Sequence, residues 1–469
     1  MNKSIKYIYF ITLIIAMVSI SSCKKPLSFS TDNLSFSQDT VFFDTVFTTI
    51  GSVTKRFKIY NNSKKTVKIE GIELVGGASS PFRINVDGAS GTQFAPIELE
   101  GKDSLFIFIE VTIDPNNATN PLVIEDQIRF RTNGKDQFVE LVAWGQDAYF
   151  HYTYFSQQIY DKNEGTWPND KPHVIYGAAI VDSAKSLIIP AGTEIYLHKN
   201  AYLFVYKGSL TIDGTLGNEV TLQGDRLESF YDDVSGQYYG IYFNKALPSS
   251  INYAIIKNGT SGIHLYDDDP SNPGYTLQLS NTIIQNNASY GVFIYSGAKV
   301  KAENCIIAKN GIHSLLVLEG GGFNFNNCHL LGYANGEQVS AAVGISNYYA
   351  NQSTQTTVVS SINEGTITNS VIYGNVDHEI AIDTISDIAI TLNFDFQYNL
   401  IKSETVFTSP IFNPTNNLWN DEPLFINTNG SDFHFTSPSP LIDNAGPMSS
   451  PVDIEGNGRS IPDIGAYEF

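Results

Sequence analysis

The chain has 469 residues, of which 16% are charged and 12% aromatic, and its formal net charge is −20. This length indicates at least two domains or an elongated array, and the composition favours β-structure over helix bundles. The acidic balance excludes nucleic acid and an anionic membrane surface as partners, because both require basic patches.

Residues 1–22 predict a secretory signal peptide, since two lysines precede an apolar run (7–20) that is too short for a comfortable membrane span. The small residues before Cys23 resemble the lipobox of bacterial lipoproteins, which implies that Cys23 becomes a lipid-modified N-terminus. By analogy with lipoprotein sorting, Lys24 favours the outer membrane. We therefore expect a lipid-anchored protein at the cell surface; the alternative is an ordinary signal peptide with an incidental cysteine.

Residues 23–147 predict a β-sandwich. Alternating segments such as KRFKIY (55–60), LFIFI (105–109) and IRFR (128–131) are separated by turn formers. The order of these segments resembles the bacterial immunoglobulin-like domains related to the hydin and major-sperm-protein group. That resemblance implies a spacer or adhesion role for this unit.

Small-x-apolar phrases recur in residues 187–469 and predict a parallel β-helix, with 148–186 as a linker and N-terminal cap. Successive small residues are 28, 23, 23 and 42 positions apart. Three short strands and three turns use about 22–25 residues, which is one coil of such a solenoid. The small residues are Ala254, Thr282, Cys305, Cys328 and Ser370.

Cys305 and Cys328 are one period apart, and we expect both to point into the same interior column as small buried residues. A disulfide between them is an alternative, although parallel side chains give it an awkward dihedral. The asparagine after most phrases is expected in a left-handed bend. These positions are Asn258, Asn286, Asn310 and Asn375.

The segments 186–225 and 439–469 closely resemble the opening coils and the closing phrase of bacterial right-handed β-helix surface proteins. That resemblance implies a pectin-lyase-like fold, which hosts lyases, hydrolases, adhesins and proteins without a known activity. In the closing phrase, GRSIPDIGAYEF includes Arg459, which we expect to form a buried structural ion pair beside Asp443, Asp453 and Asp463.

A lyase needs a base and a cation near the substrate carboxylate, whereas a glycosidase needs carboxylates gathered on one face. Neither pattern is evident, so the catalytic residues stay unassigned; Lys257 or Lys309 beside acids in one groove would favour an enzyme. Asp267, Asp268 and Asp269 form an acidic loop with three interpretations: a solvated turn, a calcium- or sugar-binding loop, or a catalytic cluster.

DIEGNG (453–458) begins like a calcium loop but lacks its final acidic ligand. No metal site or cofactor is predicted beyond this possible calcium. The histidines are scattered, and His329 is expected to face outward at the surface.

Alignment of the second strand of successive coils (262–266, 291–295 and 314–318) places His264 and Phe293 in one outward column, with Tyr266 and Tyr295 at the strand ends. Exposed aromatic rings suit the apolar faces of sugars. The alternative is that the insertion near 338–362, or the first domain, covers these rings as an interface.

The sequence thus predicts an all-β protein with an N-terminal immunoglobulin-like β-sandwich followed by a right-handed parallel β-helix. We expect a glycan-binding or structural and adhesion module, whose partners are the membrane through the lipid on Cys23 and polysaccharide or other surface proteins. The competing hypothesis is a polysaccharide lyase or glycoside hydrolase.

Overall fold

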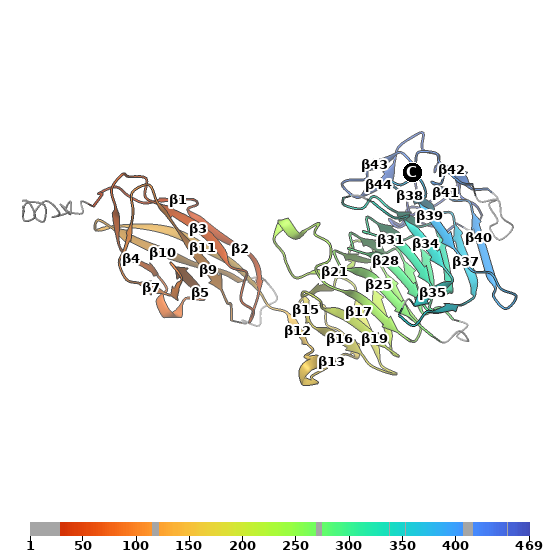
Figure 1. The fold of residues 1–469 in the computed structure, drawn as a ribbon, viewed down its shortest axis with the longest axis horizontal. Coiled ribbons are helices and arrows are strands. Elements are labelled where there is room, and N and C mark those ends of the chain that lie inside the picture. Colours follow the sequence, from red (N-terminus) through yellow and green to blue (C-terminus); the bar gives the residue numbers. More distant parts are fainter. Residues whose placement is uncertain are drawn as a thin grey trace, which may run out of the picture. The chain divides into compact units, whose positions relative to one another are not determined.

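The computed structural model describes residues 29–114, 122–268, 274–336, 338–351, 353–406, 416–447 and 449–469. The chain divides into two units, 1–146 and 147–469, each built from strands (Figure 1). The predicted signal peptide and Cys23 lie outside the described residues. Within the described ranges, no helix is both long and apolar enough to cross a membrane.

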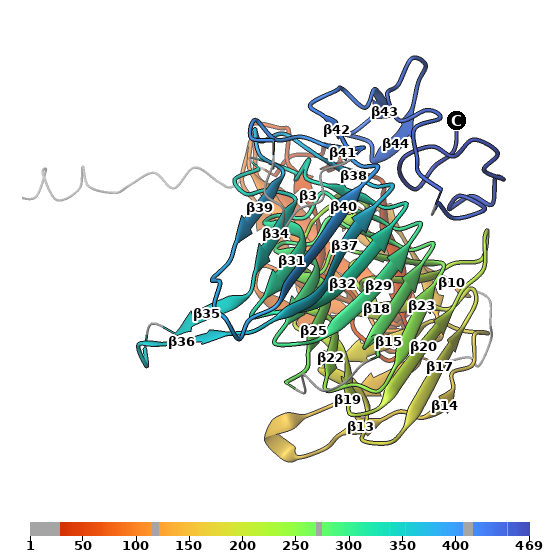
Figure 2. The same ribbon diagram turned by 90° about the vertical axis from the view of Figure 1, so that its right-hand side faces the viewer.

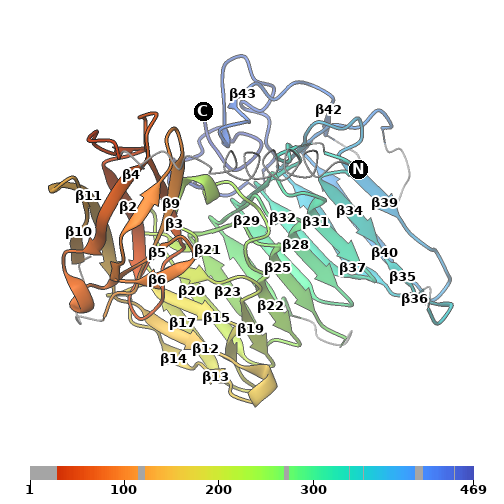
Figure 3. The ribbon, with the colours of Figure 1, turned by 60° about the vertical axis from the view of Figure 1, so that its left-hand side comes forward.

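The first unit consists of two sheets around one apolar core (Figure 3). One sheet has the order β1 (Ser35–Phe36), β3 (Lys55–Tyr60), β9 (Ser104–Val111), β5 (Phe82–Val86) and β6 (Ala89–Gly91). The other has the order β2 (Thr40–Phe47), β11 (Lys135–Gln146), β10 (Leu122–Thr132), β4 (Val67–Leu74) and β7 (Gln93–Phe94), and β8 (Ile97–Leu99) also pairs with β4. Alternate residues of these strands are buried between the sheets, which is the pattern of a β-sandwich.

The second unit winds through three parallel sheets, with one strand of each sheet per coil (Figure 2). Sheet I has 11 strands: β12 (Tyr149–Tyr152), β15 (His173–Tyr176), β18 (Glu194–Leu197), β21 (Val220–Gly224), β24 (Ala254–Lys257), β27 (Ile283–Gln285), β30 (Ile306–Ala308), β33 (His329–Leu331), β38 (Val371–Tyr373), β41 (Leu400–Ile401) and β42 (Leu418–Trp419). Sheet II has nine: β13 (Asp161–Lys162), β16 (Ala178–Val181), β19 (Tyr202–Tyr206), β22 (Gly240–Asn244), β25 (Ser261–Tyr266), β28 (Tyr290–Tyr295), β31 (His313–Leu318), β34 (Val343–Ser346) and β39 (Ile380–Asp383).

Sheet III also has nine strands: β14 (Gly165–Thr166), β17 (Ser186–Pro190), β20 (Ser209–Asp213), β23 (Ser249–Asn252), β26 (Leu277–Ser280), β29 (Lys299–Glu303), β32 (Gly321–Asn326), β37 (Ile362–Thr368) and β40 (Leu392–Gln397). Two hairpins lie outside the coils: β35 (Tyr348–Asn351) with β36 (Thr356–Val359), and β43 (Phe425–Asn427) with β44 (Asp432–Phe435). Short 3₁₀ helices span Gly77–Ser79, Phe155–Gln157 and Ser229–Tyr231.

The coils begin earlier than the sequence predicted. Strands β12, β13 and β14 pair in parallel with β15, β16 and β17 of the next coil, so 148–186 is coil rather than linker and cap. The first coil shows little signal in the sequence, because β13 and β14 have only two residues each and are polar.

Inward side chains of the three sheets form one continuous core, which includes Cys305 and Cys328. Both cysteines are fully buried and free, so they occupy the interior without a disulfide. Each thiol donates to the carbonyl oxygen two residues earlier, at 3.3 Å. Thr282 and Ser370 donate from the equivalent position in their coils, at 2.7 Å. A hydroxyl or thiol at this position therefore bonds a carbonyl oxygen at the bend, whereas Ala254 fills the equivalent position of its coil without a donor.

A left-handed asparagine directly precedes each of these small residues, at the bend from sheet III to sheet I. Their φ values lie between 48° and 51°, and the residues are Asn281, Asn304, Asn327 and Asn369. The expected bend after the phrase is left-handed at Asn258 and Asn286, but not at Asn310 or Asn375. After β30 Lys309 takes the positive φ instead, one position before Asn310.

Residues 425–469, here called the closing segment, pack on the outward face of sheet I and form a second core. That core joins Ile306, Leu331 and Val371 of the coils to Phe433 and Ile464 of the closing segment. His329 was expected at the surface, and this is wrong: it does face out of the coil, but the closing segment buries it completely, against Phe425 and Tyr467.

Asn327 fastens the closing segment to the coils. Its side-chain oxygen accepts from the Ser450 backbone (2.8 Å) and the Ser449 hydroxyl (2.9 Å), and its amide group donates to the carbonyls of Asp463 and Gly465. The left-handed bend thus directs an amide side chain away from the coil and toward the closing segment.

We predict that Asn327→Gly lowers the free energy of unfolding by about 1–3 kcal/mol, because buried partners lose their hydrogen bonds while the positive φ stays tolerated. Asn327→Ala should cost about 1 kcal/mol more, since alanine is strained in the left-handed region. Hydrogen exchange of residues 449–469 measures both effects. Equal protection in Gly and Ala variants would contradict the strain argument, and unchanged protection in both would contradict the fastening.

Candidate functional site

The outward face of sheet II carries a continuous stack of aromatic rings, here called the aromatic ladder: Phe204, Tyr242, His264 and Phe293. Register pairs these residues on consecutive strands β19, β22, β25 and β28. Ring centroids are 5.3, 4.6 and 4.6 Å apart along the ladder, and neighbouring planes are inclined by 20–30°. The ladder is half-buried, because each ring covers part of its neighbours. The result is a strip of apolar rings along the solenoid axis.

Further aromatic residues flank the ladder on both sides. At the strand ends, Tyr266 and Tyr295 lie 5.6 Å apart, and Tyr206 occupies the same row two strands earlier. At the other side, Tyr290 packs on Phe293 at 5.0 Å. These flanking residues make the aromatic strip wider than one column of rings.

His264 acts in the ladder as a neutral ring. Burial lowers its pKa to about 4, so at pH 7 it is uncharged and stacks between Tyr242 and Phe293. Its Nδ1 lies 2.9 Å from the Tyr239 hydroxyl, which fixes the ring orientation. Among the described residues, the Nε2 atom has no hydrogen-bond partner, and it is therefore a polar atom within an otherwise apolar strip.

The described residues of the insertion near 338–362 contact the edge of the aromatic strip. Its hairpin β35–β36 projects from the end of β34 (Figure 2), and Tyr349 meets Tyr295 edge-on at 6.3 Å. Tyr349 itself stays 39% exposed. The hairpin therefore borders one side of the aromatic strip.

The acidic loop differs from the expectation of three solvated carboxylates. Asp267 is buried, Asp268 is exposed and pairs with Lys245 at 2.8 Å, and Asp269 lies outside the described residues. The hydrogen bond from Lys245 lowers the pKa of Asp268. A carboxylate whose charge is neutralised by a lysine is a weak ligand for calcium.

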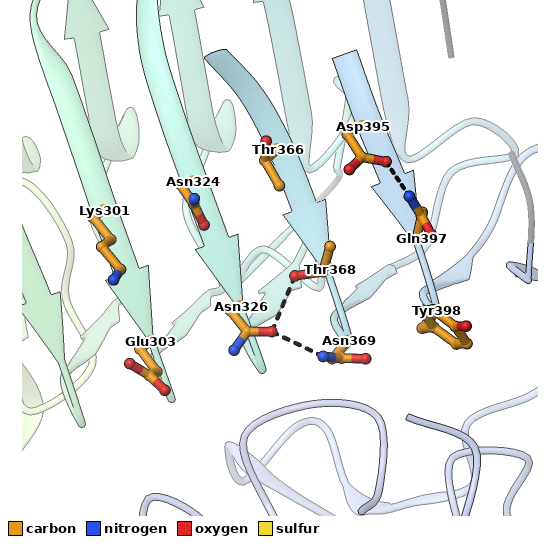
Figure 4. Close-up of a pocket in the computed structure, with 10 residues that line it drawn as sticks. All are labelled: Lys301, Glu303, Asn324, Asn326, Thr366, Thr368, Asn369, Asp395, Gln397 and Tyr398. Carbon is orange, nitrogen blue, oxygen red and sulfur yellow. Dashed lines mark hydrogen bonds between the residues drawn. The ribbon is translucent and has the colours of Figure 1, made fainter. Parts of the chain in front are cut away.

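A hollow, here called the polar groove, lies on the outward face of sheet III and has a volume of about 320 Å³. Figure 4 shows its lining on strands β29, β32, β37 and β40. One row runs Lys301, Asn324, Thr366 and Asp395, and the next runs Glu303, Asn326, Thr368 and Gln397. Asn369 and Tyr398 complete the lining. The groove therefore offers amides, hydroxyls, one ammonium group and two carboxylates.

Neither Lys257 nor Lys309, which beside acids in one groove would favour an enzyme, lines this groove. Lys309 is buried and donates to the Asn429 carbonyl of the closing segment at 2.8 Å. Lys257 lies on β24 of sheet I, which is another face of the solenoid. The basic residue in the groove is Lys301, one that sequence reasoning did not single out.

Arg459 holds the closing segment together, but through different partners from those expected. Its guanidinium donates to the Glu468 carboxylate (3.2 Å) and to the carbonyls of Asp463 (2.9 Å) and Gly465 (2.8 Å). The Asp463 carboxylate instead accepts from the backbone of Asp443 and Phe469. The pattern of charged residues in a sequence gives no information about backbone carbonyls, so it indicated the aspartates as partners.

The calcium-like phrase 453–458 is a hydrogen-bonded turn. Asp453 is fully buried, and its carboxylate accepts from the backbone of Glu455, Asn457 and Glu468 at 2.7–3.0 Å. Among the described residues, no group of three or more histidine, cysteine, aspartate or glutamate side chains has a geometry that could hold a metal ion.

The sequence alignment of the strands was right for His264 and Phe293, and the register confirms it. It missed Phe204, Tyr242 and the residues around them, although YLFVY (202–206) carries aromatics at alternate positions and YYGIYF (238–243) is rich in them. It also missed the polar groove, whose rows consist of common polar residues with no local pattern.

Comparison with known proteins bears on the fold. Residues 191–330 match the family described as "Right handed beta helix region". No curated protein matches the chain.

Three solved structures share parts of the chain at low similarity. The PapD-like domain 7 of human CEP192 is 12% identical over 27% of this chain and 94% of that one, with a TM-score of 0.17. A family 123 glycoside hydrolase from Clostridium perfringens is 11% identical over 24% and 26% (TM-score 0.17), and the periplasmic chaperone SfaE is 12% identical over 24% and 57% (TM-score 0.18). Scores this low support no conclusion about this chain.

The matched residues 191–330 begin just before β18, end in β33 and include all four residues of the aromatic ladder. Together with the three parallel sheets, this match identifies the fold: the chain is all-β and contains a right-handed parallel β-helix.

Proposed function

We propose that the chain is a cell-surface lipoprotein, anchored through Cys23, whose β-helix binds a glycan along the aromatic ladder. The observation that carries this proposal is the uninterrupted stack of four outward rings at 4.6–5.3 Å spacing. Sugar rings present apolar faces that pack on such a strip. The coil spacing of about 4.8 Å gives an extended chain several equivalent contact points.

Charge favours a neutral glycan as the ligand class. The chain carries a formal net charge of −20, so a polyuronate would be repelled without bridging cations. The ladder contributes no charge of its own, because His264 is neutral at pH 7. Binding through such a strip rests on stacking and on hydrogen bonds from flanking tyrosines.

The alternative is a purely architectural role for the β-helix, and this role makes a different prediction about what contacts the aromatic ladder. In that role a protein partner, rather than a sugar, would cover the rings. The half-buried state of the ladder and the bordering hairpin are compatible with either occupant, and a glycan array on residues 24–469 separates the two.

We predict that Phe293→Ala or Tyr242→Ala weakens glycan binding about 2- to 12-fold, because each loses one aromatic contact of about 0.5–1.5 kcal/mol. The matched control is Phe230→Ala, which removes an aromatic residue that is 77% exposed and lies outside the ladder. Affinity is measured by calorimetry with the best ligand of the array. Equal losses in control and ladder variants, or no binding to any glycan, would refute the proposal.

Affinity should also stay constant between pH 8 and pH 5. His264 has its pKa lowered to about 4 by burial, so it gains a charge only below that range. A fall in affinity centred near pH 6.5 would instead mean that an ordinary, exposed histidine controls binding.

A second candidate function, hydrolysis or lyase chemistry on a polysaccharide, is favoured by the polar groove alone. Lys301, Glu303 and Asp395 bring a cation and two carboxylates to one hollow, and these are the group types that general acid–base chemistry uses.

If the groove is catalytic, Asp395→Asn or Lys301→Met should abolish release of unsaturated products or new reducing ends while leaving binding on the ladder unchanged. Thr211→Val, on the same face of sheet III at β20, is the control. Release of no product by the unaltered protein from any bound glycan would remove the enzymatic candidate.

A further inference from the structure

The first coil of the solenoid encloses a chain of hydrogen bonds that starts at a carboxylate and ends at a backbone carbonyl. The Asp161 carboxylate lies 2.7 Å from His151 Nδ1, and His151 Nε2 lies 2.9 Å from His173 Nδ1. His173 Nε2 lies 2.8 Å from the carbonyl oxygen of Pro168. His151 is 8% exposed and His173 is 1% exposed, so both imidazoles are buried, whereas the side chain of Asp161 is 27% exposed.

Neighbouring side chains hold the relay in place. The Asn163 amide donates to the Asp161 carboxylate at 2.7 Å, and the Trp167 indole donates to the Asn163 oxygen at 3.0 Å. The Trp167 ring stacks on both imidazoles, with centroids 4.1 Å from His173 and 4.5 Å from His151. The positions of both imidazoles are therefore constrained by stacking as well as by hydrogen bonds.

Counting donors shows that the relay needs an extra proton. Three contacts lie between two terminal groups, a carboxylate and a carbonyl, that only accept. Each contact needs one hydrogen, and two neutral imidazoles supply only two. With neutral rings, one contact would bring two acceptors together at less than 3 Å, inside a buried site where an unmade hydrogen bond is costly.

We propose that this relay is a proton-holding clasp that closes the N-terminal coil, with His151 as an imidazolium paired to the Asp161 carboxylate and His173 as a neutral ring. All three contacts are then satisfied: His151 donates to Asp161 and to His173, and His173 donates to Pro168.

The charge environment agrees with this assignment. Burial lowers the pKa of His173 to about 4, which keeps that ring neutral. Burial would raise the pKa of Asp161, but the hydrogen bonds from His151 and Asn163 outweigh it, and the pKa is lowered. The other charged group acting on His173 is Asp170, which accepts from the hydroxyl of the stacked Tyr149.

The clasp makes the first coil sensitive to alkaline pH. In an unfolded chain, the extra proton is held only below the ordinary histidine value of about 6.5. The folded relay needs it, so its stabilisation is fully present below that pH and is lost as pH rises through the relay's own titration. The end of the solenoid should therefore loosen at high pH while the central coils stay closed.

The test uses nitrogen-15 NMR of the histidine rings in residues 24–469, with hydrogen exchange of β12 and β15 as the readout of opening. At pH 7 we expect imidazolium shifts for His151 and neutral-ring shifts for His173. Exchange protection of β12, corrected for base catalysis, should fall by up to about tenfold per pH unit from about pH 6.5 until the folded relay has lost its proton, and should then level off. A neutral His151 at pH 7 would overturn the proposal.

Asp161→Asn is the diagnostic variant. An asparagine amide can donate to His151 Nδ1, so the three contacts are satisfied with two neutral rings and no extra proton. We expect this variant to fold, to lose the imidazolium signal and to lose the alkaline loosening of β12. Asp225→Asn is the matched control, because it alters another histidine–aspartate pair, with His198 at 2.7 Å and 47% exposed. Alkaline loosening that persists in Asp161→Asn would refute the clasp.

Discussion

In-register parallel pairing between coils is the interaction on which the rest of the structure depends. Each strand bonds to its counterpart one coil away, so a residue's side chain lies directly above the equivalent side chain of the previous coil. Inward columns then become the core, whereas outward columns become the faces that meet solvent or ligand. A change of register by one residue would exchange the two sets, and both the ladder and the thiol positions would be lost.

The same pairing creates a problem at the bends, where inter-strand bonding is interrupted. The bend from sheet III to sheet I solves it with a left-handed asparagine and a small donor at the next position, as in Asn304–Cys305 and Asn327–Cys328. Cysteine is suited to this position because it is small, apolar and still a weak donor. The two cysteines are thus neighbours in the core for a packing reason, and no covalent bond between them is needed.

Different groups cover the side of the solenoid and close its first coil. On the outward face of sheet I, the closing segment supplies a second apolar core that buries even His329. In the first coil, polar groups close the interior through the relay of Asp161, His151 and His173. The outward faces of sheets II and III differ in chemistry at their central strands: one carries aromatic rings, and the other is polar and contains both signs of charge.

Sequence alone determined the fold class, because the 23-residue period, the alternation of apolar residues and the glycine-rich opening are local patterns that survive in a single chain. It also placed His264 and Phe293 on one column, since equivalent positions of a repeat must align. It could not place the first coil, because two of its three strands, β13 and β14, have only two polar residues each and show no period.

Only the tertiary structure decided which outward residues stay accessible. Whether His329 or Lys309 meets solvent depends on a closing segment about 100 residues further along the chain. The polar groove and the relay likewise join residues of separate strands whose neighbours in sequence carry no common signal. Periodicity fixes the direction of a side chain, but what covers it is decided by contacts between segments distant in sequence.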